Sequence, residues 1–201
     1  VTSGTNAVTL TTNGDKSYTC TITFTDAAAN AASAMTLTAF VVDTSASAAT
    51  ESTAVTTPTS DTTPDVVISV SEAGTIAVGG TDCGLQSSSS VTSGSNTVTL
   101  TTNGDKSYTC TITFTDAAAN VASALTLTAF VVDTSASAPT ESAAVTTPTS
   151  DTTPDVVISV SEAGTIAVGG TDCGLSSSSS VSSGSNTVTL TTNGDKSYTC
   201  T

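Results

Sequence analysis

Hydrophobic and polar residues alternate with a period of two along several stretches of the chain. In SYTCTITFTD, single threonines separate four residues of one face, Tyr108, Cys110, Ile112 and Phe114. Successive side chains of a β-strand point to opposite faces of the sheet, so this pattern predicts a half-buried strand. The stretches NTVTLTT, PDVVISVSEAG, GTIAVGG and ALTLTAFVV favour strands in the same way, and no segment has a helical period. We therefore predict an all-β protein.

The sequence repeats with a period of 90 residues. Val1–Ser90 and Val91–Ser180 differ at seven positions, so 90 − 7 leaves 83 identical residues, and Val181–Thr201 begins a third copy. This unit is too long for one repeat of a solenoid and has the size of one small β-sandwich domain. Both ends of the sequence fall inside a copy, so we expect a longer tandem array in the parent protein.

Prolines among serines and threonines mark the domain boundaries. The segment Val131–Asp155 contains Pro139, Pro148 and Pro154. Because proline is tolerated at sheet edges, we interpret this segment as an end strand, a short junction and an irregular first edge strand. The predicted domains are the C-terminal part of one sandwich (1–46), a complete sandwich (47–136) and the N-terminal part of a third (137–201).

Five cysteines occupy two positions of the repeat: Cys83 and Cys173 in GGTDCG, and Cys20, Cys110 and Cys200 in SYTC. The domain frame pairs Cys83 with Cys110 and Cys173 with Cys200, and it leaves the partner of Cys20 outside the chain. Without histidine or a CxxC motif, disulfides are favoured over a metal site and over buried thiols. Such a bond stabilises a domain by about 3–4 kcal/mol in the chain-entropy model and indicates an oxidising compartment.

The charge is strongly acidic, with 3 basic and 17 acidic residues and a net charge of −14. Neutralising nucleic-acid phosphates requires clustered lysine and arginine, so we expect no nucleic-acid partner. No apolar stretch approaches the ~20 residues of a membrane-spanning helix, and we expect no membrane insertion of this segment. Because histidine is absent, Ser-His and Cys-His nucleophile pairs cannot form. We predict no catalytic residues and no enzymatic activity.

Several motifs together resemble a known family. DTTPDVVISVSEAGTI, GDKSYTCTITFTDAAAN and LTLTAFVVDTSASAP are similar to the tandem bacterial Ig-like repeats of large surface adhesins and extracellular matrix proteins. The resemblance covers the whole 90-residue unit and implies Ig-like β-sandwiches with one disulfide each. Those repeats often have TDxAGN where this chain has TDAAAN, so Ala119 argues against a turn that needs positive φ at that position.

The resemblance also implies functional positions. Tyrosine two residues before the strand cysteine is similar to the tyrosine corner of Ig-type sandwiches, which would place corners at Tyr18, Tyr108 and Tyr198. Similar adhesin repeats bind Ca²⁺ at domain junctions, where it takes six to eight oxygen ligands. The candidate ligands near the junctions are Asp116, Asp133, Glu141, Asp151 and Asp155. The alternative is a solvated acidic surface that keeps neighbouring fibres apart.

We expect a structural function: a stalk or fibre module of a secreted or cell-surface bacterial adhesin or filament, in contact with adjacent repeats of its own chain. One alternative is a filament subunit whose copies associate laterally or through exchanged strands. Another is a module that binds glycans or a host protein. The repeat offers little aromatic surface for a glycan, since only the ring of Phe130 is not assigned to an inward position by the pattern.

Overall fold

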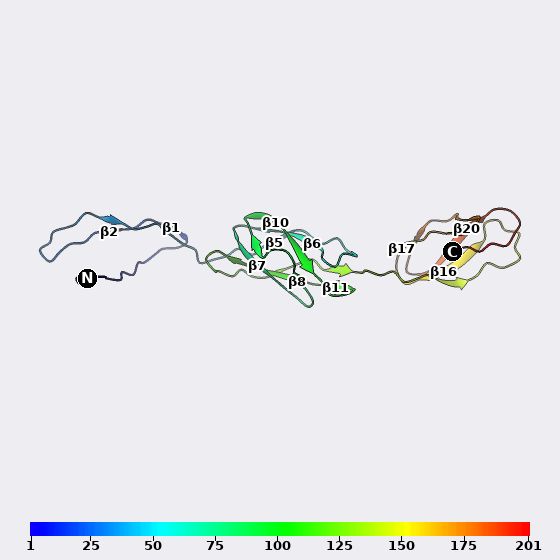
Figure 1. The fold of residues 1–201 in the computed structure, drawn as a ribbon, viewed down its shortest axis with the longest axis horizontal. Coiled ribbons are helices and arrows are strands. Elements are labelled where there is room, and N and C mark those ends of the chain that lie inside the picture. The colour runs from blue at the N-terminus through cyan, green and yellow to red at the C-terminus, as the bar shows by residue number, and fades with distance from the viewer. The chain divides into compact units, whose positions relative to one another are not determined.

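The computed structural model describes residues 1–201 and contains twenty β-strands and no helix (Figure 1). The prediction of an all-β protein is confirmed. The chain divides into two compact units, Val1–Thr134 and Ser135–Thr201. This division lies two residues before the boundary that the prolines predict.

Residues 50–132 form a complete set of strands within the first unit. One sheet has the strand order β5-β6-β10-β8, with β5 at Thr50–Thr53, β6 at Asp65–Val70, β10 at Gly94–Thr101 and β8 at Gly84–Leu85. All its pairings are antiparallel, and β10 opposes β6 with Val98 facing Val66. The strand before the proline-containing segment, β5, lies at an edge, where missing backbone donors are tolerated.

A second four-stranded sheet has the order β13-β12-β7-β9, with β13 at Leu125–Thr126, β12 at Thr111–Asp116, β7 at Gly74–Gly79 and β9 at Ser90–Val91. Here Phe114 of β12 opposes Ile76 of β7. A separate pair joins β11 (Lys106–Tyr108) to β14 (Phe130–Val132). The complete domain is therefore built from two sheets and a short ribbon.

The two sheets share one hydrophobic core. Every second residue of β12 is buried, and its Ile112 and Phe114 side chains are fully inaccessible together with Val66 and Ile68 of β6. Full burial of one such side chain contributes roughly 1.5–3 kcal/mol relative to exposure. The period-two pattern thus selects the core face of each strand, and the threonines between these residues lie on the outer face.

The flanking residues form shorter strands. In the first unit, β1 (Lys16–Tyr18) pairs with β4 (Phe40–Val42), and β2 (Thr21–Ile22) pairs with β3 (Met35–Thr36). These four strands lie one 90-residue period before β11, β14, β12 and β13. Residues 1–44 therefore build only the strands that close the second half of a domain.

The second unit builds the first half of a domain. Its sheet has the order β15-β16-β20-β18, with β15 at Thr140–Ala143, β16 at Asp155–Val160, β20 at Gly184–Thr192 and β18 at Cys173–Leu175. The remaining strands, β17 (Gly164–Thr165) and β19 (Ser180–Val181), form a two-stranded pair. This unit repeats the first sheet of the complete domain.

The turn after β12 contradicts one expectation. Ala119 has a φ of 69°, and its equivalent Ala29 has a φ of 66°. The sequence argued against a turn with positive φ at this alanine, and the structure has that turn. The turn is held by Asp116, whose carboxylate accepts hydrogen bonds from the Ala118 and Asn120 amides at 2.8 Å each. These bonds offset the steric cost of the alanine Cβ in this conformation.

Replacing Ala119 with glycine is therefore expected to stabilise the complete domain. Relief of the left-handed strain exceeds the added entropy of the unfolded chain, so the free energy of unfolding should rise by about 0.5–1 kcal/mol. Denaturant unfolding measures the change. The control is Ala118→Gly, where positive φ is absent and the substitution should destabilise. A119G behaving like A118G would contradict the strain argument.

Candidate functional site

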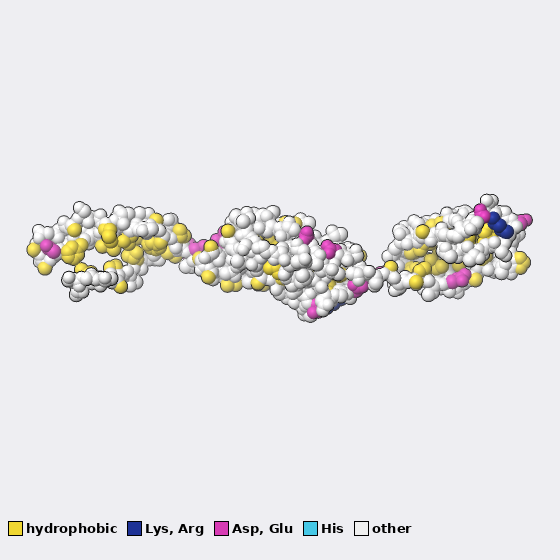
Figure 2. Space-filling view, in the orientation of Figure 1, with side chains coloured by type: hydrophobic (Ala, Val, Ile, Leu, Met, Phe, Trp, Pro, Cys, Tyr) yellow, Lys and Arg dark blue, Asp and Glu magenta, His cyan; other side chains and the backbone are white.

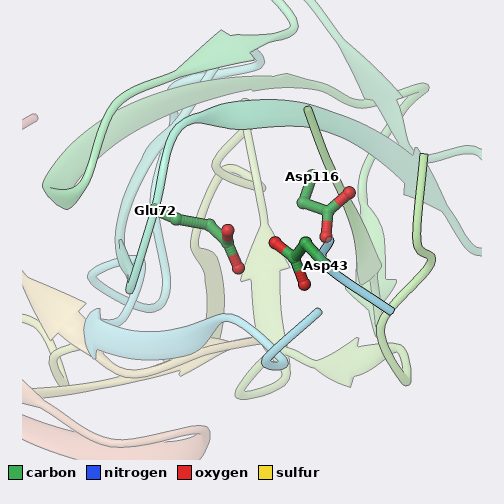
Figure 3. A group of neighbouring side chains, drawn as sticks. All are labelled: Asp43, Glu72 and Asp116. Atoms are coloured by element: carbon green, nitrogen blue, oxygen red, sulfur yellow. The ribbon is translucent and has the colours of Figure 1, made fainter. Parts of the chain in front are cut away.

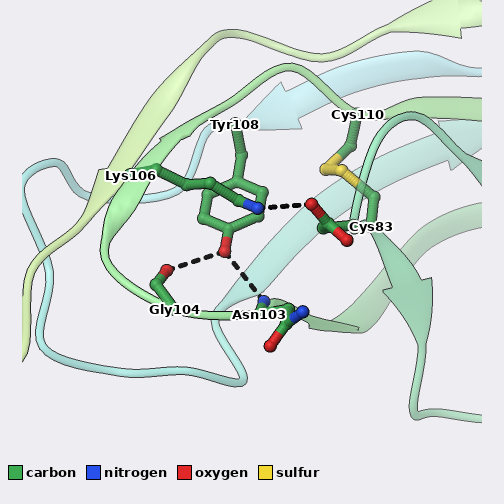
Figure 4. A network of polar contacts seen from close by, with 7 residues as sticks. Cys83, Asn103, Gly104, Lys106, Tyr108 and Cys110 are labelled. Carbon is green, nitrogen blue, oxygen red and sulfur yellow. Dashed lines mark hydrogen bonds and ion pairs between the residues drawn. A yellow bond between two sulfur atoms is a disulfide. The ribbon is translucent and has the colours of Figure 1, made fainter.

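Tyr108 ties the turn before its strand to the core. Its hydroxyl donates to the Gly104 carbonyl at 2.7 Å and accepts from the Asn103 amide at 2.8 Å (Figure 4). The ring is 1% exposed and stacks on Phe130, with the centroids 5.5 Å apart. Two backbone groups of the turn thereby gain hydrogen-bond partners at the end of the core.

The same corner recurs in the other copies. The Tyr18 hydroxyl contacts the Asn13 amide and the Gly14 carbonyl at 2.7 and 2.8 Å. The Tyr198 hydroxyl donates to the Gly194 carbonyl. Each copy of the repeat thus closes its NGDKSY turn through the tyrosine hydroxyl, although only Tyr108 is fully buried. The recurrence follows from the identity of this sequence stretch in all three copies.

A disulfide lies beside the corner and joins two connecting segments of the complete domain. Cys83 precedes β8 of the first sheet, and Cys110 precedes β12 of the second. They are bonded across 27 residues of chain, as are Cys173 and Cys200 in the second unit. Cys20 is free. Gly80 passes so close that a Cβ there would lie 3.2 Å from the Cys83 sulfur and 2.7 Å from the Thr109 carbonyl oxygen.

An ion pair covers the corner on its outer side. The ammonium of Lys106 bonds the Asp82 carboxylate (Figure 4) and lies 5.3 Å from the centroid of the Tyr108 ring. The hydrogen bond from Lys106 and its charge lower the pKa of Asp82, and the bond to Asp82 raises the pKa of Lys106. Both side chains are more than a third exposed, so the pair adds little stability.

Three carboxylates converge near the end of the complete domain that meets residues 1–44. Asp43 follows β4, Glu72 lies in the turn between β6 and β7, and Asp116 is the last residue of β12. One carboxylate oxygen of each lies within 4.8 Å of those of the other two (Figure 3). The side-chain amide of Asn120 donates to the Asp116 carboxylate at 2.8 Å and to the Asp43 carbonyl at 3.1 Å. Asn120 thereby connects residues 1–44 with the complete domain.

The carboxylates of this cluster differ electrostatically. Desolvation and the negative charges of Asp43 and Asp116 raise the pKa of Glu72. Burial raises the pKa of Asp116. Hydrogen bonds from Asn120 and from the turn amides lower the pKa by more than burial raises it, so the net pKa lies below the usual value. The hydrogen bonds of the turn therefore favour the ionised form of Asp116. The neighbouring negative charges disfavour the ionised form of Glu72.

Of the acids predicted to bind Ca²⁺, only Asp116 belongs to this cluster. The other four predicted acids lie outside the cluster. Asp151 accepts from the Thr153 amide at 2.8 Å, and Asp155 accepts from the Thr189 hydroxyl at 2.7 Å. Glu141 is exposed on the edge strand β15, and the Asp133 amide donates to Thr59 at 2.9 Å.

Sequence reasoning missed Asp43 and Glu72. Asp43 is the 90-residue equivalent of Asp133, which was predicted, so applying the repeat to the preceding junction would have identified it. Glu72 carries no such signal, because it is far from Asp116 in sequence and reaches it only through the pairing of β7 with β12. Three carboxylates supply oxygen ligands of the kind that Ca²⁺ prefers, and backbone or water oxygens would have to complete its shell.

No protein-family model matches the chain, and no curated protein matches it. The structure contains no helix that is long and apolar enough to cross a membrane. The corner, the disulfide and the carboxylate cluster are therefore interpreted from their own geometry.

Removing the corner hydroxyl with Tyr108→Phe is expected to lower the free energy of unfolding of the complete domain by about 1–3 kcal/mol, because the Asn103 amide and Gly104 carbonyl lose their partner. Native-state amide exchange at Asn103 should accelerate. The matched control is Tyr18→Phe, which removes the same bonds from a partly exposed ring that water reaches. An unchanged exchange rate at Asn103 in Y108F would contradict the assignment.

Glu72→Gln is expected to raise the melting temperature at neutral pH when EDTA is present, because it removes one of three repelling carboxylates. A raised folded-state pKa means that stability is fully present below the ordinary value of 4.5 and is lost as pH rises through the folded pKa. The difference between variant and wild type should therefore grow with pH above 4.5.

Thermal unfolding between acid and neutral pH measures this difference. The control is Glu162→Gln, at the equivalent position of the second unit, whose curve of melting temperature against pH is expected to run parallel to that of wild type. A curve for E72Q that also runs parallel to that of wild type would contradict the repulsion between the three carboxylates. Repeating the neutral-pH measurement with millimolar Ca²⁺ tests the cluster as a site: binding would raise the melting temperature of wild type more than that of E72Q, and no shift in either would reject it.

Proposed function

We propose that this chain is part of the stalk or fibre of a secreted or cell-surface bacterial protein, built from tandem Ig-like β-sandwich domains. The observation that carries the proposal is the 90-residue repeat with 83 identical positions. Each copy builds the same tyrosine corner, and the complete domain and the second unit each contain one disulfide. Nearly identical, cross-linked domains in series suit a spacer that bears tension.

The Ig-like assignment is supported by the complete domain. Its two four-stranded sheets bury their apolar faces against one core, and its disulfide joins the segment between β7 and β8 to the residue before β12. Tyr108 lies three residues before the first residue of β12, and its hydroxyl donates a hydrogen bond to the carbonyl of Gly104, four residues earlier in the chain. The tyrosine corner of Ig-type sandwiches has the same arrangement. These features agree with the family resemblance of the sequence.

Contacts around residues 43–45 support a junction with limited freedom. Asp15 accepts hydrogen bonds from the amide and hydroxyl of Thr44, at 3.1 and 2.8 Å. Asn120 holds the carbonyl of the preceding Asp43. One repeat later, the Thr134 hydroxyl donates to Asp105 at 2.8 Å. Residues on both sides of a junction thus bind its backbone, which favours a semi-rigid array over freely jointed domains.

Disulfides are typical of an oxidising environment, and this supports the extracellular part of the proposal. The alternative of a glycan-binding module is disfavoured by the complete domain. Its aromatic side chains, Tyr108, Phe114 and Phe130, are each at most 1% exposed, so they provide no stacking surface for a sugar ring.

Small-angle X-ray scattering on three tandem copies of residues 47–136 tests the stiffness of the array. A ten-residue strand spans about 34 Å, so a stiff array should have a maximum dimension of roughly 100–120 Å in EDTA and unchanged in Ca²⁺. Extension only with Ca²⁺ would assign the stiffness to the carboxylate cluster. A broad distribution of dimensions in both conditions would contradict the spacer function.

A further inference from the structure

The first and last segments of the complete domain lie side by side. Residues 57–59 follow β5 and run parallel to β14, with a bridge between Thr59 and Val132. The Thr59 amide donates to the Val131 carbonyl at 3.0 Å, and the Asp133 amide donates to the Thr59 carbonyl at 2.9 Å. The segment that enters the domain is therefore bonded directly to the segment that leaves it.

The hydroxyl of Thr57 adds a further bond to this pairing. The Val131 amide donates to the Thr57 hydroxyl oxygen at 2.8 Å. In a regular parallel ladder the acceptor would be a backbone carbonyl. A threonine side chain thus lengthens the contact between the two segments by one hydrogen bond.

A carboxylate joins the same two segments at a second point. Glu51 of β5 accepts from the amide and the hydroxyl of Thr128, which precedes β14, at 2.9 and 2.8 Å. Both bonds use Oε2 of Glu51, whereas its Oε1 is buried and has no hydrogen-bond partner. An unpaired buried oxygen is unfavourable. The domain keeps this oxygen at the position that links its first strand to Thr128.

The side chains of these contacts lie at the surface rather than in the core. Thr57 and Thr128 are exposed, and Glu51 is half-buried. Figure 2 shows the visible face of the complete domain as mostly white, the colour of polar uncharged side chains and backbone, with hydrophobic side chains scattered among them. Substitutions at Thr57 and Glu51 therefore leave the hydrophobic core in place.

The direction of the two segments determines how they respond to tension. In a tandem array, tension pulls the complete domain through the residues before β5 and the residues after β14. Because residues 57–59 and β14 run parallel, these two pulls are opposed along the axis that the segments share. The bonds between them are then loaded together in shear. Two antiparallel strands pulled apart at one end would instead lose their bonds one at a time.

We propose that the contact of residues 51–59 with residues 128–133 is a clamp that bears tension in the complete domain, and that the disulfide limits how far the domain extends after this clamp opens. The inference rests on the proposed stalk function. Cys83 and Cys110 both lie between the two clamp segments in the sequence, so their bond does not hold the clamp closed. Once the clamp is open, the 27 residues that the bond spans cannot extend.

The limit has a definite size. From Thr50 to Val132 the chain has 132 − 50 = 82 residue steps, and the disulfide removes 27 of them, which leaves 55. Fully extended, these 55 steps span roughly 180–200 Å. Without the disulfide, the released chain would be about 90 Å longer.

Single-molecule force spectroscopy on the full 201-residue chain, held by tags at its two ends, tests the clamp. Thr57→Val removes the acceptor for the Val131 amide. At constant force, T57V is expected to raise the unfolding rate of the complete domain roughly 2- to 10-fold, because one hydrogen bond is absent from the barrier. The matched control is Thr56→Val, at an exposed neighbouring position, whose rate should equal that of wild type.

Glu51→Ala tests the second contact of the clamp. It removes the acceptor for the amide and hydroxyl of Thr128 and should also raise the unfolding rate under force. The control is Glu141→Ala, at the equivalent position of the second unit, which should leave the unfolding rate of the complete domain unchanged.

A third variant separates the clamp from general loss of stability. Val91→Ala removes buried methyl groups from β9, which belongs to neither clamp segment. It should lower the midpoint of denaturant unfolding at least as much as T57V does, and yet raise the unfolding rate under force by less. Rates under force that follow the denaturant midpoints of both variants would overturn the clamp.

The double variant Cys83→Ser, Cys110→Ser tests the limit on extension. The length released when the complete domain unfolds should be about 90 Å greater than in wild type. The matched pair Cys173→Ser, Cys200→Ser should leave this length unchanged. A second measurement needs no folding without the bond: dithiothreitol, which is oxidised to its cyclic disulfide as it reduces Cys83–Cys110, should add one step of about 90 Å to C173S/C200S held extended.

Wild-type unfolding rates of T57V and E51A would overturn the clamp, and an unchanged released length without the disulfide would overturn the limit. Both results would leave the scattering test of stalk stiffness unaffected. Conversely, a broad distribution of dimensions in that test would contradict the stalk function without altering the response of a single domain to force.

Discussion

Each sheet of the complete domain has one apolar face, and that face is removed from water only when the other sheet covers it. The consequences are visible within one chain, because the same sequence occurs both covered and uncovered. Ile76 is 4% exposed beneath β12, whereas its equivalent Ile166 is half-buried and lines a hollow. Backbone order follows the same rule, since β7 spans six residues and β17 only two. The dependence of each half on the other makes the 90-residue unit the smallest closed structure.

The connection between the two sheets is reinforced where the chain enters β12. The disulfide from Cys83 to Cys110 and the bonds of the Tyr108 hydroxyl lie within three residues of that entry. The core contains few aromatic rings, and the stacked pair of Tyr108 and Phe130 belongs to this corner. Covalent, aromatic and hydrogen-bonding contributions therefore combine at one end of the domain. The packing there leaves no space for a side chain at position 80, because a Cβ on Gly80 would lie 3.2 Å from the Cys83 sulfur.

The opposite end of β12 is shaped by a strained turn. Ala119 adopts a positive φ that a glycine would adopt freely, and the carboxylate of Asp116 holds the turn through its amides. The turn places the Asn120 amide between Asp116 and the carbonyl of Asp43. The strained turn at the end of the complete domain thus also makes the contact with Asp43 of residues 1–44. Asp116 and Asp43 belong with Glu72 to the cluster of three carboxylates.

Residue pattern alone was sufficient for the all-β class, the period of 90 residues and the core faces of the strands, because alternation and self-identity are local properties of a sequence. The domain frame also identified which cysteines belong together, since each complete unit contains two. The pattern failed at Ala119, where hydrogen bonds that the Asp116 carboxylate accepts from the turn amides override the preference of an isolated residue. It also failed at Glu72, which approaches Asp116 only after β7 and β12 have paired. Strand identity and inward positions were determined by the sequence, because they depend on neighbours along the chain. The carboxylate cluster was decided by tertiary structure, because it depends on which strands pair with one another.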